Sequence, residues 1–133
     1  MAVAVLYARV ATKEQLGDEA LAQQEHKLRV FAKERGLNVK KVISEKGSGL
    51  TCDRPGLNEI LKLPPEYDTV LSADISRIGR NTMETIEWCY KLRLAGKDLV
   101  CADGSHMQLD DIKQLADGAY KKWLDKQKQQ KSN

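Results

Sequence analysis

Short apolar runs alternate along the chain with longer segments whose hydrophobic residues recur at helical spacing. The apolar runs have the length and near-continuous hydrophobicity of buried parallel strands. They predict strands at residues 3–8, 39–44, 69–73 and 98–102. One-sided hydrophobic spacing predicts helices at 19–35, from about Pro55 to Pro64, from Asn81 to Gly96, and at 109–127. This alternation predicts an α/β fold with a mostly parallel sheet of four to five strands and helices on both faces.

The helical segments each present one apolar face, which we expect to pack on the sheet. The expected inward residues of the first three are Leu21, Gln24, Leu28, Phe31 and Ala32, then Leu57, Ile60 and Leu61, then Met83, Ile86, Tyr90 and Leu94. Trp88 adds to the third helix, and the last helix carries Ile112, Leu115, Ala116, Ala119 and Trp123. The apolar surface of these last two helices can be core or a dimer interface, and the pattern alone does not separate the two.

The composition fits a single soluble unit of 133 residues, with 41% hydrophobic and 31% charged residues and a net charge of +3. We expect a domain at 1–105, followed by a C-terminal helix and basic tail at 106–133. No apolar run is long enough for a bilayer, and the N-terminus lacks the basic start of a signal peptide, so we expect a cytoplasmic protein without membrane contact.

The possible metal ligands are few and scattered. Cys52, Cys89 and Cys101 show no CxxC spacing, so we interpret them as reduced thiols, two of them buried. His26 and His106 are far apart in the sequence and have no flanking ligand residues. Because zinc requires three or four clustered ligands, we expect no metal site.

Arginines concentrate in the segments that follow the first three predicted strands. Ligands of open parallel sheets bind outside the carboxyl ends of the strands, so these segments are where a site is expected. They span residues 7–15, 47–57 and 74–81 and carry Arg9, Arg54, Arg77 and Arg80. Planar guanidinium groups bind phosphate oxygens in pairs, which favours a phosphate site. The alternative is that each arginine forms a local ion pair, with Asp53, Asp74, Glu84 or Glu87 as candidate partners.

Two other phosphate-related folds do not fit these segments. The stretch Gly47-Ser-Gly49 lacks both the GxGxxG pattern of dinucleotide-binding folds and the Gly-Lys-Ser/Thr ending of a P-loop. It is better interpreted as a turn that lets the loop approach a bound backbone. A response-regulator-like domain would need an acidic pocket, which the sequence does not supply.

The three segments together resemble the N-terminal catalytic domain of the serine recombinases, the resolvase/invertase family. The family's Tyr-x-Arg-Val-Ser-Thr-x-x-Gln motif is matched by Tyr7-Ala-Arg9-Val-Ala11-Thr12-Lys-Glu-Gln15, and its Ser-Leu-x-x-Gln helix start by Ala20-Leu21-Ala-Gln-Gln24. Its Ser-Gly loop and Arg-Pro-Gly-Leu motif correspond to Ser48-Gly49 and Arg54-Pro-Gly-Leu57, and its Arg-x-Gly-Arg signature to Arg77-Ile-Gly-Arg80. The resemblance runs from about residue 3 to 103 and implies a resolvase-like three-layer fold.

The resemblance also implies a chemistry. In this family a serine hydroxyl attacks a phosphodiester of double-stranded DNA, forms a 5′-phosphoserine intermediate and releases a 3′-hydroxyl, without metal or nucleotide cofactor. By resemblance, Arg9, Arg54, Arg77 and Arg80 bind the phosphate and stabilise the transition state. Supporting residues would be Gln24, Ser48, Asp74 and Ser76. The family assembles as homodimers, with tetramers only in a DNA synapse, and we expect the same here.

The chain departs from the family pattern at the nucleophile, where Ala11 stands in place of serine. Ser76 occupies a position that is Asp in many small resolvases, although other branches carry Ser there after an Asp two residues earlier. We interpret residues 106–133 as a shortened dimerisation helix, and they show neither a helix-turn-helix nor a zinc-ribbon pattern; an excised catalytic domain and a naturally short protein both fit the sequence. We therefore expect a site-specific recombinase domain that is inactive because Ala11 replaces the nucleophilic serine. The alternative is a non-enzymatic, recombinase-like protein that binds DNA or a recombinase partner and regulates it.

Overall fold

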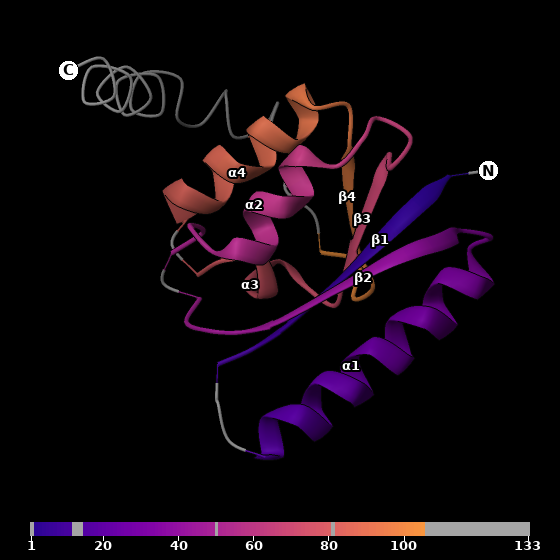
Figure 1. Ribbon diagram of the computed structural model, residues 1–133, viewed down its shortest axis with the longest axis vertical. Coiled ribbons are helices and arrows are strands. Elements are labelled where there is room, and N and C mark those ends of the chain that lie inside the picture. The colour runs from indigo at the N-terminus through magenta and orange to yellow at the C-terminus, as the bar shows by residue number, and fades with distance from the viewer. Residues whose placement is uncertain (1, 12–14, 50, 81, 106–133) are drawn as a thin grey trace.

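The computed structural model describes residues 2–11, 15–49, 51–80 and 82–105. Strands and helices alternate along it: β1 (Val3–Val10), α1 (Gln15–Glu34), β2 (Asn38–Lys46), α2 (Pro55–Lys62), β3 (Thr69–Ser72), α3 (Ile75–Ile78), α4 (Thr82–Leu94) and β4 (Asp98–Cys101). The strands pair in parallel in the order β2-β1-β3-β4. The sheet separates α1 from α2 and α4, so helices cover both faces as predicted (Figure 1).

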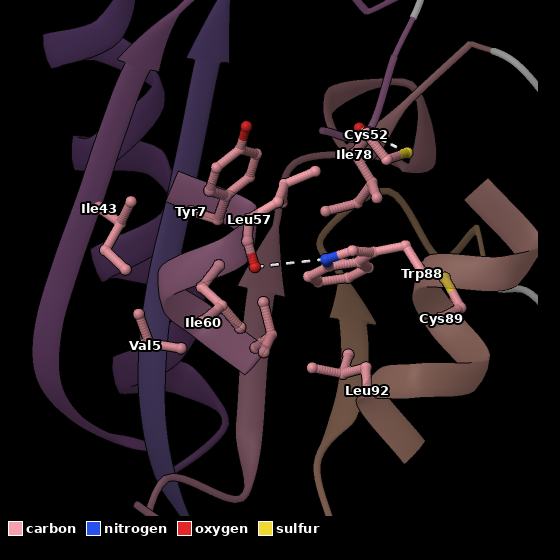
Figure 2. Packing of buried hydrophobic residues seen from close by; sticks show 11 residues of the cluster. Val5, Tyr7, Ile43, Cys52, Leu57, Ile60, Ile78, Trp88, Cys89 and Leu92 are labelled. Carbon is pink, nitrogen blue, oxygen red and sulfur yellow. Dashed lines mark hydrogen bonds between the residues drawn. The ribbon is translucent and has the colours of Figure 1, made fainter. Parts of the chain in front are cut away.

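Two groups of buried side chains hold the three layers together. Alternate residues of a strand point to opposite faces, and β1 accordingly sends Leu6 towards α1 while Val5 and Tyr7 pack on the other side. Leu6 packs with Leu28 and Ala32 of α1. The larger group lies between the sheet, α2 and α4, and we call it the apolar cluster (Figure 2): Val5, Tyr7, Ile43, Cys52, Leu57, Ile60, Val70, Ile78, Trp88, Cys89 and Leu92.

The inward faces of α1 and α2 agree with the prediction, but that of α4 needs a correction. Ile86 of α4 is buried as predicted, whereas Leu94 at the end of the helix is 72% exposed. Trp88 belongs to the apolar cluster, and its indole nitrogen donates to the carbonyl of Leu57 at 3.3 Å (Figure 2). Ile86 and Trp88 are therefore core residues. The predicted helix at 109–127, with its apolar residues, lies outside the described residues.

The boundaries differ from the sequence prediction where the arginines lie. β1 continues through Val10, so Arg9 belongs to the strand and not to the loop after it. The reason is that β2 also continues and pairs Arg9 with Glu45 and Val10 with Lys46. α1 begins at Gln15, four residues earlier than predicted, and the segment 74–80 contains the short helix α3.

All three cysteines are free, and all three are buried, whereas the sequence analysis expected two buried thiols. Within the described ranges, no three His, Cys, Asp or Glu side chains gather as they would around a metal ion. None of the helices in those ranges combines the length and the apolar character that crossing a membrane requires.

Candidate functional site

Four arginines gather where β1, β2 and β3 end, and we call Arg9, Arg54, Arg77 and Arg80 the arginine cluster. Arg9 is the second-last residue of β1, and Arg54 directly precedes α2. Arg77 lies in α3, and Arg80 follows it in the connection to α4. Their exposure differs sharply: Arg9 and Arg54 are 1% and 6% exposed, whereas the Arg77 side chain is 34% exposed and Arg80 is exposed.

Arg9 places all three of its side-chain nitrogen atoms on main-chain carbonyl groups. Nε donates to the carbonyl of Arg77 at 2.8 Å, and Nη2 donates to that of Ser76 at 2.8 Å. Nη1 donates to the carbonyl of Gly47 at 2.7 Å, beyond the end of β2. Burial first, and then the positive charge of Arg54, lowers the pKa of the Arg9 guanidinium. The carbonyl dipoles hold this charge in a setting that has little water.

Gly49 lies directly against the Arg9 side chain. A Cβ atom at Gly49 would stand 2.8 Å from Arg9 Nη2 and 3.2 Å from Arg80 Cγ, so a side chain at this position has no room. The carbonyl of Gly49 also accepts a hydrogen bond from the main-chain nitrogen of Arg80 at 2.7 Å. Gly49 thus joins the loop after β2 to the loop after α3.

Arg54 is held by main-chain carbonyls of α3 and by a partly buried carboxylate. Its Nη2 donates to the carbonyls of Ile78 and, at 3.2 Å, of Arg77. Its Nε lies 4.0 Å from Oε2 of Glu45. Glu45 also accepts from the Tyr7 hydroxyl, and through Oε1 from the main-chain nitrogen of Gly56 at 3.0 Å. Burial, and next the hydrogen bond to Glu45, raises the pKa of Tyr7.

Arg77 and Arg9 each donate a side-chain hydrogen bond to the main-chain carbonyl of the other. Arg77 Nη1 donates to the carbonyl of Arg9 at 3.1 Å, while its own carbonyl accepts from both Arg9 and Arg54. Its Nε is buried without a hydrogen-bond partner, 3.7 Å from Oδ2 of Asp74. The Arg80 side chain makes no hydrogen bond to a residue that the structure describes.

The supporting residues act on the main chain around the cluster. Gln24 of α1 accepts from the Arg9 nitrogen at 3.0 Å and donates to the Arg9 carbonyl at 3.2 Å, which fixes the end of β1. Asp74 accepts from the Ser76 hydroxyl, and its carbonyl accepts from Ser72 at 3.0 Å. Ser48 presents its carbonyl 3.5 Å from Arg54 Nη1.

Ala11 is the first residue after β1 and is exposed. The carbonyl of Val10, its chain neighbour, accepts from the main-chain nitrogen of Gly47 at 2.9 Å. The guanidinium of Arg77 reaches the carbonyl of Arg9, only two residues before Ala11. The nucleophile position of the family motif therefore follows directly on the strand that carries Arg9, but the side chain there is a methyl group.

Local ion pairing explains little of the arginine cluster. Of the four candidate partners, only Asp74 pairs with one of these arginines, at 3.7 Å. Asp53 accepts from Asn58, Glu84 from the main-chain nitrogen of Cys52, and Glu87 pairs with Lys91. Within the part of the chain that the structure describes, the one further carboxylate in contact is Glu45. Four guanidinium groups therefore meet two carboxylates, which leaves an excess of two positive charges among the described residues.

Tyr7, Glu45 and Gly49 are the contributors that the sequence analysis did not assign to the site. Glu45 carried a detectable signal, because it is a carboxylate at the carboxyl end of a strand that neighbours the strand of Arg9. Tyr7 belongs to the recombinase-like motif, but its role as a partner of Glu45 depends on the register of β1 and β2. Gly49 belongs to the Ser-Gly motif, but its close contact with Arg9 arises from tertiary packing that the sequence does not show.

A cavity of about 420 Å³ lies beside this cluster, between α2 and α4. It is lined by Thr51, Cys52, Asp53, Asn58, Leu61, Glu84, Glu87, Trp88 and Lys91. Its three carboxylates would repel a phosphate, and none of the four arginines is among the described residues that line it. We therefore place the candidate site at the arginine cluster and not in the cavity.

Comparison with known proteins identifies the same family that the motifs resemble. The family described as "Resolvase, N terminal domain" matches residues 4–121. The C-terminal catalytic domain of ISC1926 TnpA, an IS607-like serine recombinase, is 27% identical with a TM-score of 0.69, and the match covers 85% of this chain and 79% of that one. The corresponding domain of IS1535 TnpA, also IS607-like, is 34% identical with a TM-score of 0.61, covering 74% and 69%. A resolvase family site-specific recombinase from Streptococcus pneumoniae shares the fold at 17% identity, with a TM-score of 0.66 and 99% of both chains covered.

Proposed function

Because the chain belongs to the resolvase family and is built as a serine recombinase catalytic domain, we propose that its arginine cluster is a binding site for the phosphate backbone of double-stranded DNA. The observation that carries the proposal is the unbalanced charge at the ends of three strands. Positive charge that neighbouring carboxylates do not balance, part of it on the buried Arg9 and part on the exposed Arg80, favours the approach of an anion. Phosphate diesters suit the planar, multiple donors of arginine.

The reaction that such a site serves is transesterification of DNA. A serine hydroxyl at position 11 would form a bond to phosphorus, the bond from phosphorus to the 3′-oxygen would break, and the leaving oxygen would take up a proton. Fixed positive charge stabilises the additional negative charge of the transition state, and the phosphoserine bond conserves the energy for rejoining. In this role Gln24, Ser48, Asp74 and Ser76 support the main chain that carries the arginines.

Ala11 makes the chain a DNA-binding domain that does not cleave. A methyl group has no lone pair for the attack, and a guanidinium group has donors but no acceptor, so it does not supply a nucleophile. Loss of the nucleophile costs about a million-fold in comparable covalent enzymes. We therefore assign the chain to a recombinase catalytic domain without strand-cleavage activity.

A regulatory role is the second candidate, and the exposed Ala11 favours it. A domain that binds the DNA backbone but cannot cut could occupy a recombination site or pair with an active recombinase. Such a protein needs an intact arginine cluster and no hydroxyl at position 11. The two candidate functions differ in whether a hydroxyl group restored at position 11 is enough for DNA strand cleavage.

The experiment is the Ala11→Ser substitution, in the full chain fused to a DNA-binding module of known target. On a nicked suicide substrate, the recombinase assignment predicts a covalent 5′-phosphoserine complex with Ala11→Ser and none with Ala11. Ala11→Ser combined with Arg77→Ala is the matched control, because it keeps the hydroxyl and removes a phosphate ligand. Absence of product from Ala11→Ser, with DNA binding verified, would support the regulatory role. Product from the Ala11 protein would contradict the assignment of position 11.

A further inference from the structure

The connection between β2 and α2, residues 47–54, brings Arg54 to the arginine cluster, and a carboxylate of α4 holds the last turn of this connection. Oε2 of Glu84, in the first turn of α4, accepts a hydrogen bond from the main-chain nitrogen of Cys52 at 3.1 Å. The carbonyl of Cys52 accepts in turn from the main-chain nitrogen of Arg54 at 3.0 Å. Glu84 is therefore linked to the backbone of Arg54 through a single residue.

We propose that Glu84 is a positioning residue, whose carboxylate fixes the turn at Cys52 and thereby the place of the Arg54 guanidinium in the cluster. The inference rests on the proposed function and adds a carboxylate to its site. Arg54 stands at the N-cap of α2 but forms no side-chain hydrogen bond that caps the helix, so the start of α2 depends on other contacts. A negatively charged residue would then favour the binding of a polyanion by holding a turn.

The turn at Cys52 also supports the loop after α3. The Cys52 thiol donates to the carbonyl of Ile78 at 3.6 Å (Figure 2), and the same carbonyl accepts from Nη2 of Arg54. A Cβ atom at Gly79 would stand 2.7 Å from Cys52 Sγ and 2.6 Å from Oγ1 of Thr85, so Gly79 is packed between the turn and α4. A shift of Cys52 would therefore disturb Ile78 and Gly79 as well as Arg54.

Glu87 provides a contrast on the same helix. Glu84 and Glu87 both line the cavity between α2 and α4. Glu87 pairs with Lys91 at 3.2 Å, and this contact stays within α4. Glu84 instead binds a residue 32 positions away in the sequence and so joins α4 to the turn before α2. If only their charge mattered, the two carboxylates would affect DNA binding alike.

Two substitutions separate the reach of Glu84 from its charge. Glu84→Asp keeps the charge but shortens the side chain by one methylene group, which withdraws the oxygen from the Cys52 nitrogen. Glu84→Gln keeps the length and an acceptor oxygen but removes the charge. By fluorescence anisotropy with a short duplex of arbitrary sequence, we expect Glu84→Asp to weaken binding by the full chain several-fold and Glu84→Gln to bind at least as tightly as the unsubstituted chain. Unchanged binding in Glu84→Asp, or an equal loss in Glu84→Gln, would overturn the proposal.

Glu87→Asp is the matched control, because it shortens a neighbouring carboxylate of the same cavity. The ion pair of Glu87 is partly exposed, so we expect duplex affinity to change by no more than about twofold. A loss as large as that of Glu84→Asp would overturn the proposal, since any disturbance of α4 would then have the same effect. Thermal unfolding verifies that each variant is folded.

The side-chain signals of arginine show whether Glu84 acts on Arg54. In protein labelled with 15N-arginine, the Nε–H signal of Arg54 is identified by its loss in Arg54→Lys. Without DNA, we expect this signal to shift in Glu84→Asp and to keep its position in Glu84→Gln and Glu87→Asp, whereas a role in overall stability alone would not move it in folded protein. An unmoved signal in Glu84→Asp would overturn the positioning role.

Failure of the proposed function has a different signature. It fails if the unsubstituted chain and the double variant Arg77→Gln with Arg80→Gln bind the duplex equally well. The Arg54 signal is measured without DNA, so it tests the action of Glu84 on Arg54 in that case too.

Discussion

The apolar cluster beneath α2 and α4 and the two buried members of the arginine cluster, Arg9 and Arg54, both exclude water, but the two regions hold their side chains by different means. Leu57 and Ile60 are fully buried and make contacts that depend on volume. Arg9 is as buried as they are, yet it depends on three directed hydrogen bonds to carbonyls. The first region needs apolar groups of the right size, whereas the second needs one chemical group in one orientation. The fold alone would not require a buried arginine with three directed hydrogen bonds.

The largest effect on stability is expected in the apolar cluster. Leu57→Ala removes a side chain that is 0% exposed, so it should lower the free energy of unfolding by about 2–5 kcal/mol, through lost burial and a remaining cavity. Urea denaturation measures this loss. Leu94→Ala is the matched control, because Leu94 is 72% exposed, and it should change stability by no more than about 0.5 kcal/mol. Equal losses in both variants would contradict the described packing of α2 and α4.

Two glycines in one loop sharpen the comparison at the arginine cluster. Gly49→Ala places a methyl group 2.8 Å from Arg9 Nη2, and we expect a loss of about 1–3 kcal/mol together with weaker DNA binding. At Gly47 the nearest atom to an added Cβ is Arg54 Cδ at 3.9 Å, and its backbone is not left-handed. Gly47→Ala should therefore leave both stability and binding nearly unchanged. Urea unfolding and a duplex titration of the two variants measure the difference, and equal behaviour would argue against close packing on Arg9.

Alkaline pH tests the burial of the apolar cluster through one of its thiols. Burial, as the main cause, raises the pKa of the Cys89 thiol in the apolar cluster to about 12. Above pH 9 the unfolded chain loses this proton while the folded chain keeps it, so stability should fall as pH rises from 9 to 12, by at most about 1.4 kcal/mol per pH unit for this thiol. Cys89→Ala should flatten the decline of the urea midpoint with pH. An identical slope in Cys89→Ala would contradict the prediction.

The sequence predicted the layers of this fold better than it predicted the contacts of the site. Apolar runs and helical spacing identify β1, β3, α1 and α2 because burial imposes a period on the side chains. The short helix α3 was missed because four residues show no period. The exposed position of Leu94 was missed because a helix that ends beyond the sheet keeps its apolar spacing after its contacts have ended.

The site shows the same limit at the level of single residues. The motifs identified Arg9, Arg54, Arg77 and Arg80, and the sheet rule predicted that the segments carrying them lie at one end of the strands. They could not distinguish a buried Arg9 from an exposed Arg80. That difference depends on which carbonyls of α3 and of the loop after β2 lie within reach of each guanidinium, and tertiary packing decides this.

The most direct test of the account is whether DNA binding depends on the arginine cluster or only on net charge. Arg77→Gln with Arg80→Gln lowers the formal net charge from +3 to +1, and so does the control pair Arg29→Gln with Arg93→Gln, at exposed positions on α1 and at the end of α4. The measurement is duplex affinity as a function of salt concentration, by fluorescence anisotropy. The account predicts that the first pair lowers the slope of log affinity against log salt by about 2, because each lost phosphate contact removes about 0.9, and that the control pair leaves it unchanged. Equal losses from the two pairs would contradict a phosphate site at the arginine cluster.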